Sequence, residues 1–187
     1  IRGLVGSEMC IRDRFNRGSK NSFFALNEKI TGERWQSKVG RLIKYLKKRK
    51  INNLFISAPE NVAWLLNIRG YDNPNSPIPN CKLILQNTGK IHLIADVKKL
   101  EKIKKIKIYK KLKFIKKENF YKLLLKLEGE KFQIDESTCS ILEENLIKNN
   151  FKVTKTLDPI YKLKSIKNSV EINNTKNIHI DDGVAVT

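Results

Sequence analysis

The stretch IRGYDNPNSP, residues 68–77, holds the side chains in this sequence that are best placed for polar chemistry. Arg69 can donate paired hydrogen bonds to a carboxylate or to backbone carbonyls, and Tyr71 and Asp72 follow it closely. Gly70 permits a backbone reversal after the preceding apolar helix, so we expect Arg69 to lie at the rim of the domain. We expect Arg69 or Asp72 to contact groups across that rim. In the alternative, Arg69 holds its own loop through backbone carbonyls or through Asp72.

The cysteine and histidine residues give no sign of a metal site. Cys10, Cys81 and Cys139 lie far apart, form no CxxC pair and are not accompanied by His92 or His179. Zinc is therefore not indicated, and the thiols read as buried and inert. No nucleophile is paired with a base, so the sequence predicts neither catalytic residues nor metal ligands. A reducing, cytoplasmic location follows from the odd number of cysteines.

The formal net charge of +19 is the feature that most favours a nucleic-acid partner. Lys supplies 30 of the 38 basic residues, whereas phosphate-reading surfaces favour Arg. The densest basic run, residues 97–117, interleaves Lys with Leu and Ile, as the solvated faces of amphipathic elements do. We interpret the charge as compositional. A basic nucleic-acid-binding α/β module remains the alternative.

Apolar spacing predicts the elements that position this loop. A helix capped by Thr31 is expected to carry one apolar stripe, formed by Trp35, Val39, Leu42, Ile43 and Leu46. A short strand, NLFIS (53–57), then precedes a helix that starts at Pro59 and buries Trp64, Leu65 and Leu66.

Strands and helices alternate further along the chain, which predicts an α/β fold with a mixed sheet covered by helices. The expected elements are a hairpin over 81–96 turning at Gly89, a basic helix near 97–104, a strand near 106–109, a helix near 118–127, a strand over 131–135, a helix from Ser137 and a strand over 151–155.

The two ends of the chain differ in character from this middle part. Residues 1–14 resemble a translated adapter sequence, and the chain up to residue 30 reads as a non-native or disordered lead-in. Residues 156–165 read as a linker broken at Asp158–Pro159, followed by a helix from Val170. The expected division is a lead-in over 1–30, a domain over 31–156, and a linker with a truncated helix over 157–187. No apolar run is long enough to cross a membrane.

Three stretches together resemble the Xaa-Pro aminopeptidases, the three-domain branch of the creatinase/prolidase metallopeptidases. NVAWLLNIRGYDNPNSPIPN (61–80) is similar to a segment of the domain that precedes the catalytic one. DPIYKLKSIKNSVEI (158–172) resembles the entry helix of the catalytic domain, and NIHIDDGVAVT (177–187) resembles the continuation of that helix, with Ile178 where the family usually has Ala.

The resemblance implies a creatinase-type N-terminal (second) domain followed by the first helix of a truncated pita-bread domain. It implies a parent enzyme that releases an N-terminal residue ahead of proline, using two divalent metal ions, expected to be manganese, and acting as a cytoplasmic homodimer. This segment precedes the metal ligands of the family, so it would carry no catalytic residue, and His179, Asp181 and Asp182 read as structural. Arg69, Tyr71 and Asp72 become candidates for the substrate-cleft wall, meeting the peptide or the catalytic domain. A fragment of a creatinase or prolidase relative is a second alternative.

Overall fold

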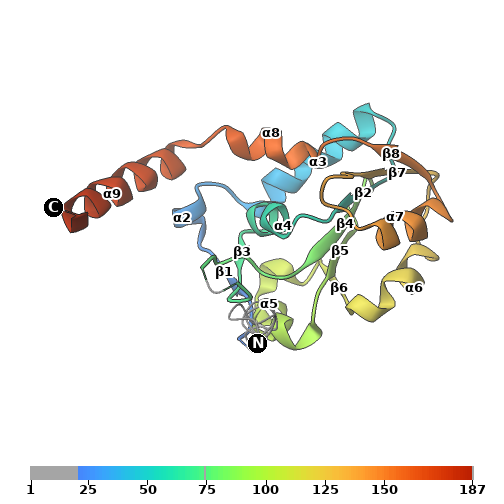
Figure 1. Cartoon of the computed structure of the whole chain (residues 1–187), viewed down its shortest axis with the longest axis horizontal. Helices are drawn as coiled ribbons and strands as arrows, with labels where there is room; N and C mark the ends of the chain where they lie inside the picture. The colour runs from blue at the N-terminus through green and yellow to red at the C-terminus, as the bar shows by residue number, and fades with distance from the viewer. Residues whose placement is uncertain (1–20, 74, 187) are drawn as a thin grey trace, which may run out of the picture.

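The computed structural model describes residues 21–73 and 75–186, except for the side chain of Val186. The centre of this part of the chain is a six-stranded mixed sheet (Figure 1). In spatial order its strands are β6 (Lys113–Ile115), β5 (Ile91–Ile94), β4 (Lys82–Gln86), β2 (Asn53–Ile56), β7 (Lys131–Ile134) and β8 (Lys152–Lys155). β4 is antiparallel to both of its neighbours, and the other pairs are parallel. The predicted α/β fold with a mixed sheet is confirmed.

Helices cover both faces of the sheet (Figure 1). One face carries α3 (Trp35–Lys48) and α4 (Pro59–Leu66), and the other carries α6 (Phe120–Leu124) and α7 (Ile141–Lys148). Leu54 packs in the core beneath α3 and α4, whereas its neighbour Phe55 packs in the core beneath α6 and α7. Because successive side chains of a strand point to opposite faces, a strand covered on both sides must be apolar throughout. This explains the apolar run Leu54–Ile56 of β2, whereas the buried side chain of Asn53 at its start is hydrogen-bonded.

The basic stretch after β5 forms short helices instead of the strand expected near 106–109. These are η1 (Val97–Leu100), α5 (Glu101–Lys105) and η2 (Lys107–Tyr109), and the strand β6 begins only at Lys113. Ile103 and Tyr109 are fully or almost fully buried and Ile106 packs against the same core. A spacing of three places these side chains on one face of a 3₁₀ turn, so the expectation of a strand was wrong. A further short helix, η3 (Lys117–Asn119), leads into α6.

Two helix starts differ from expectation. Thr31 does not cap the long helix: it ends α2 (Glu28–Thr31), where Gly32 takes the left-handed conformation with φ 69°. The helix expected from Ser137 begins later, because Ser140 forms a reciprocal capping box with Glu143. The helix start at Pro59 and the hairpin turn at Gly89, with φ 90°, are confirmed.

The lead-in expected over residues 1–30 is wrong for residues 21–30, which fold onto the domain. Phe23 is fully buried, and β1 (Phe24–Ala25) pairs antiparallel with β3 (Ile68–Arg69). The short strand and the four-residue α2 offer no period long enough to be read from sequence. The adapter-like interpretation of residues 1–14 lies outside the described residues.

The linker expected over residues 156–165 is instead largely helical. Pro159 occupies the first position of α8 (Pro159–Ser165), Asp158 caps that helix, and Ile160 is fully buried. Asp-Pro therefore starts a helix here and does not interrupt one. The expected final helix is present as α9 (Ser169–Val186), which extends away from the sheet (Figure 1).

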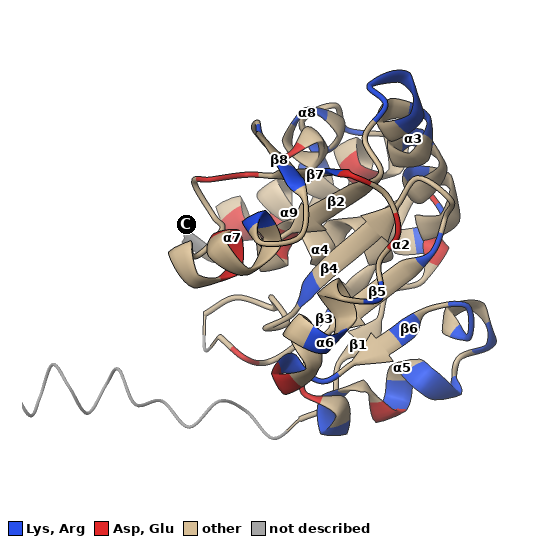
Figure 2. Ribbon diagram, turned by 90° about the vertical axis from the view of Figure 1, so that its right-hand side faces the viewer, with Lys and Arg blue, Asp and Glu red and all other residues tan. Residues whose placement is uncertain are grey.

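Basic side chains are distributed over several elements. Figure 2 shows Lys and Arg on α3, on α5 and around β6, separated by uncharged ribbon. Among the described residues several are also paired with carboxylates, for example Arg41 with Glu33 at 2.6 Å and Lys155 with Glu144 at 2.9 Å. This distribution agrees with a charge that is compositional.

Candidate functional site

The C-terminal end of α4 is a meeting point for three distant parts of the chain. Asn67 ends the helix in the left-handed conformation, with φ 54°. The last carbonyls of α4 accept hydrogen bonds from Arg69 (to Ala63, 3.1 Å), Lys38 (to Trp64, 3.0 Å) and Tyr109 (to Leu66, 2.7 Å). Carbonyls at a helix end lack partners within the helix and carry the negative end of its dipole. Two cations and a phenol therefore cap this end of α4.

Arg69 is committed to backbone groups. Its Nη1 also donates to the carbonyl of Ile68 at 2.9 Å, and within the described residues it forms no ion pair with a carboxylate. Burial lowers the pKa of its guanidinium. These contacts are the ones expected if Arg69 holds its own loop through backbone carbonyls.

Asp72 and Tyr71 lie in different surroundings. Asp72 forms an ion pair with Lys99 and accepts a hydrogen bond from the backbone of Asn80 at 2.6 Å, and its side chain is 8% exposed. Tyr71 is 54% exposed and packs one ring face against Phe24, with ring centroids 5.2 Å apart. Tyr71 is thus the candidate whose side chain is most available to a partner.

Gly70 has a different role from the one expected. Its φ is not positive, and the reversal after α4 takes place at Asn67. A Cβ on Gly70 would lie 2.9 Å from Cα of Pro79 and 3.0 Å from the ring of Phe23, closer than such contacts allow. Gly70 also donates to the carbonyl of Pro77 at 3.1 Å. The glycine therefore lets the loop over 70–80 fold back onto the β1–β3 ribbon.

Sequence reasoning missed Lys38, which is 1% exposed. Its ammonium donates to Oδ1 of Asn67 at 2.8 Å and lies 4.1 Å from the ring centroid of Trp64. Burial lowers the pKa of Lys38 to about 8, and Glu171 and Glu33 offset only part of that shift. Lys38 stands three residues after Trp35, on the apolar stripe of α3, and this spacing is the signal that could have identified it.

Trp64 links this cluster to the final helix. Leu65 and Leu66 are fully buried as expected, but Trp64 is only half-buried. Its indole Nε1 donates to Glu171 of α9 at 3.4 Å, and Glu171 forms a reciprocal cap with Asn168. Asn168 also donates to the carbonyl of Thr31 at 2.9 Å. The orientation of α9 is therefore tied to α4 and α2.

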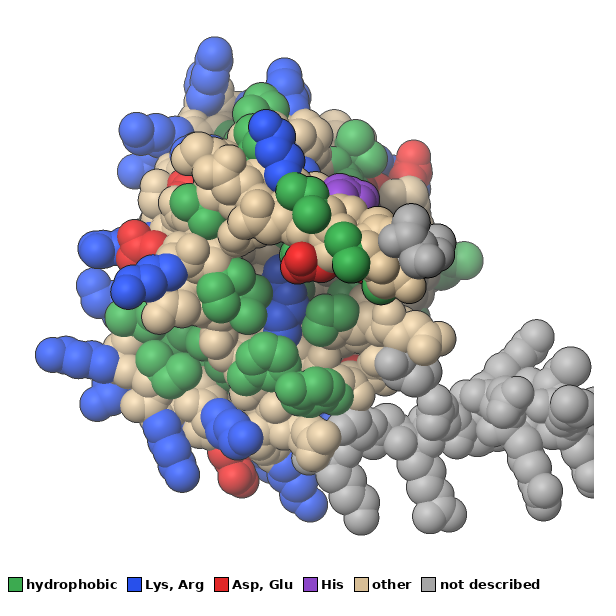
Figure 3. All heavy atoms as spheres, turned by 90° about the vertical axis from the view of Figure 1, so that its left-hand side faces the viewer, with side chains coloured by type: hydrophobic (Ala, Val, Ile, Leu, Met, Phe, Trp, Pro, Cys, Tyr) green, Lys and Arg blue, Asp and Glu red, His purple; other side chains and the backbone are tan. Residues whose placement is uncertain are grey.

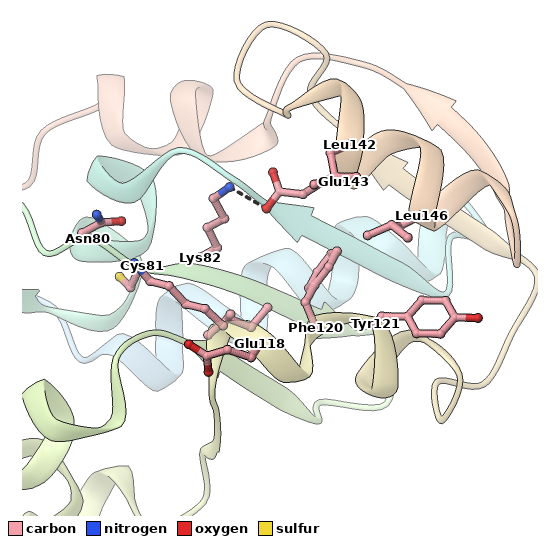
Figure 4. A pocket seen from close by; sticks show the side chains of 11 residues that line it. Asn80, Cys81, Lys82, Glu118, Phe120, Tyr121, Leu142, Glu143 and Leu146 are labelled. Atoms are coloured by element: carbon pink, nitrogen blue, oxygen red, sulfur yellow. Dashed lines mark hydrogen bonds and ion pairs between the residues drawn. The ribbon is translucent and has the colours of Figure 1, made fainter.

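The face that carries α9 is hollowed. Figure 3 shows a recess with a basic side chain at its floor and mainly hydrophobic side chains around it. A second hollow lies between α6 and α7, where a cavity of about 370 Å³ is bordered by Phe120, Tyr121 and Leu146 and by the ion pair of Lys82 with Glu143, 2.5 Å apart (Figure 4). Among the described residues that line the cavity between α6 and α7, no nucleophile is hydrogen-bonded to a base.

The donor set of this region does not fit a divalent metal. Across residues 21–73 and 75–185, no three His, Cys, Asp or Glu side chains are grouped so that they could hold one. His179, Asp181 and Asp182 are exposed on α9. Burial raises the pKa of the Cys81 thiol, and burial together with Glu143 raises that of Cys139 to about 11. Both cysteines are therefore thiols at neutral pH, which are weak metal ligands.

Comparison with known proteins gives the chain its context. A family described as the creatinase/prolidase N-terminal domain matches residues 13–171. Xaa-Pro aminopeptidase 1 of Dictyostelium discoideum is 30% identical over 169 residues, covering 89% of this chain and 26% of the relative. A probable Xaa-Pro aminopeptidase P of Podospora anserina is 28% identical over 178 residues, again covering 89% and 26%. The chain thus spans about a quarter of the length of these relatives.

Solved structures show the same fold. The X-prolyl aminopeptidase of Caenorhabditis elegans, described as a cytosolic enzyme with a di-nuclear active site, matches with a TM-score of 0.77 and 24% identity, covering 93% of this chain and 30% of that one. An Xaa-Pro dipeptidase of Bacillus anthracis matches with a TM-score of 0.59 and 15% identity, covering 74% and 38%. These comparisons give no support to a nucleic-acid-binding module. In the part of the chain that the structure describes, no helix is long and apolar enough to cross a membrane.

Proposed function

Because the chain belongs to the creatinase/prolidase N-terminal domain family, we propose that it is the non-catalytic second domain of a metal-dependent Xaa-Pro aminopeptidase, joined to the first helix of the catalytic domain. The observation that carries this proposal is the family match over residues 13–171, together with relatives named as Xaa-Pro aminopeptidases. The parent enzyme would remove the residue that precedes proline at the N-terminus of a peptide. It would act in the cytosol, as a homodimer.

The metal chemistry belongs to the part of the enzyme that this chain does not span. Two bound divalent cations would activate a water and polarise the scissile carbonyl, and manganese suits a carboxylate-rich site. The side chains of Arg69 and Lys38 cannot hold such ions, because both are cationic and repel a metal cation. The backbone N–H groups around α4 offer no lone pair for a metal to bind. The proposed role of this chain is therefore to position the peptide substrate and to restrict which peptides enter the cleft.

We assign the loop over residues 70–80 to one wall of the substrate cleft. Tyr71 presents an exposed aromatic face, and the ion pair of Asp72 with Lys99 and the carbonyl contacts of Arg69 hold the loop that carries it. α9 is joined to α4 by the hydrogen bond from Trp64 to Glu171, and it bears exposed apolar side chains at Ile172, Ile178 and Ile180. Exposed apolar side chains on an extended helix favour burial against a following domain, and this is the contact proposed with the catalytic domain.

The 187-residue chain should release no N-terminal residue from Xaa-Pro peptides, with or without Mn²⁺. The reason is that the described residues supply neither a dinuclear ligand set nor a nucleophile–base pair. The measurement is amino-acid release from a Xaa-Pro peptide, followed by chromatography at several enzyme concentrations. Turnover that increases with Mn²⁺ and stops with a chelator would contradict the proposed division of labour.

In the full-length enzyme, Tyr71→Ala should lower kcat/KM for Xaa-Pro peptides by about three- to tenfold, the range of one aromatic contact. Leu125→Ala is the control, because Leu125 is 57% exposed at the end of α6 and does not line the cavity that α6 shares with Asn80 of this loop. Both variants should remain folded, with the free energy of unfolding changed by no more than about 1 kcal/mol. Equal activity in the two variants would remove Tyr71 from the cleft wall.

A further inference from the structure

A small cavity of about 210 Å³ lies beside the edge of the sheet that β5 and β6 form, near the end of α6. Two buried polar side chains belong to its wall: Gln86 of β4, 6% exposed, and His92 of β5, 4% exposed. Leu123 and Leu127 supply apolar surface on the side of α6. Buried polar side chains around a cavity differ from the apolar lining expected of a packing defect.

His92 has a hydrogen-bonding atom without a partner. Its Nδ1 is buried and makes no hydrogen bond within the part of the chain that the structure describes. Gln86 differs, because its amide donates to Asn53 at 3.1 Å, and Asn53 in turn donates to the carbonyl of Glu128 at 3.0 Å. Buried polar atoms in proteins are normally paired, and an unpaired one calls for an explanation such as a ligand.

The charged groups around the cavity are mostly positive. Lys90 from the hairpin turn, Lys113 of β6 and Lys126 after α6 border it, and among the described residues Glu128 is the one carboxylate that does so. None of these four side chains takes part in an ion pair within residues 21–73 and 75–185. Burial, with Lys113 and Lys90, lowers the pKa of His92 to about 4, so His92 is neutral at pH 7.

We propose that this cavity binds a small oxyanion of the phosphate class. The exposed lysines Lys90, Lys113 and Lys126 border this cavity, and charge-assisted hydrogen bonds to phosphate are among the strong ones in proteins. The volume suits an ion or a small phosphate ester, since cavities for drug-sized ligands start at about 300 Å³. A neutral imidazole with its proton on Nδ1 can donate to the anion, and the nearby negative charge would raise the pKa of His92.

The sequence contains two histidines, which makes the test direct. Inorganic phosphate is titrated into the 187-residue chain at constant ionic strength, with sodium chloride as the compensating salt, while NMR follows both imidazole rings. The signal of His92 should shift saturably and its pKa should rise from about 4, whereas exposed His179 on α9 should not respond. Glycerol phosphate, titrated in parallel, distinguishes a free oxyanion from an ester by which of them binds more tightly.

Charge variants supply the control. Lys113→Gln should weaken phosphate binding by about tenfold, the loss expected for one charge-assisted contact. Lys102→Gln removes an equal charge from α5, outside the cavity, and should leave binding unchanged. No saturable shift of His92, an equal shift of His179, or equal weakening by the two variants would each overturn the proposal.

Discussion

Replacing Lys38 by Ala is expected to lower the free energy of unfolding by about 3–5 kcal/mol. The side chain is 1% exposed, so its removal leaves a cavity in the core between α3 and α4. It also leaves the carbonyl of Trp64 and the amide oxygen of Asn67 without the donor that now satisfies them. Urea unfolding followed by circular dichroism measures the loss.

Two further variants separate the causes. Lys44→Ala removes an exposed lysine from the same helix, and its effect should stay within about 0.5 kcal/mol. Lys38→Met keeps most of the apolar volume and should lose only about 1–3 kcal/mol, the cost of unsatisfied buried acceptors. If Lys38→Ala unfolds at the same urea concentration as Lys44→Ala, the buried ammonium does not stabilise the end of α4.

The buried carboxyl of Asp158 should make the fold less stable as pH rises through about 4 to 6. Burial raises the pKa of Asp158 from 3.8 to about 6, while hydrogen bonds from Ile160 and Asn61 favour the ionised form. The folded state then holds a proton that the unfolded state has already lost, so ionisation destabilises it. A shift of this size corresponds to about 3 kcal/mol of stability, present below pH 4 and lost by pH 6.

The contribution of Asp158 is isolated by comparison with Asp158→Asn. Asp135 works in the opposite direction: burial raises the pKa of its carboxyl, but hydrogen bonds from Ser137 and the Asp158 backbone together outweigh burial and lower it. The difference between the wild type and Asp158→Asn should therefore change with pH between 4 and 6. Asn177→Ala, which changes an exposed and non-titrating side chain on α9, is the control and should give a constant difference. A constant difference for Asp158→Asn as well would show that its carboxyl titrates normally.

Local pattern was sufficient for the elements with long or well-punctuated sequences. The apolar stripe of α3, the proline that starts α4 and the glycine turn between β4 and β5 each follow from one physical rule. No such rule predicts the short elements, because β1 and η2 are stabilised by contacts with residues that are distant in the sequence. Tyr109, for instance, reaches the carbonyl of Leu66 at 2.7 Å.

The contacts of the three candidate residues could not be predicted from the sequence. Arg69 ends strand β3, and Tyr71 and Asp72 follow it in the loop, yet the three have separate partners in the backbone of α4, in Phe24 and in Lys99. Those partners come from sequence positions that no local period connects. Lys38 was missed for a different reason. Its spacing from Trp35 places it on the apolar face of α3, but the residue type alone predicts an exposed side chain, because lysines are rarely buried.

The order of strands in the sheet also has a consequence for how the protein is made. β2 lies between β4 and β7, and the β2–β4 pair joins residues about thirty positions apart, whereas Asn53 faces Phe132. During synthesis the β2–β4–β5 half can form well before β7 leaves the ribosome, at about 5–20 residues per second. The edge of β2 that pairs with β7 therefore stays unpaired for several seconds during synthesis. An unpaired apolar strand edge is a template for aggregation. The nascent chain is therefore most vulnerable between the emergence of β5 and that of β7.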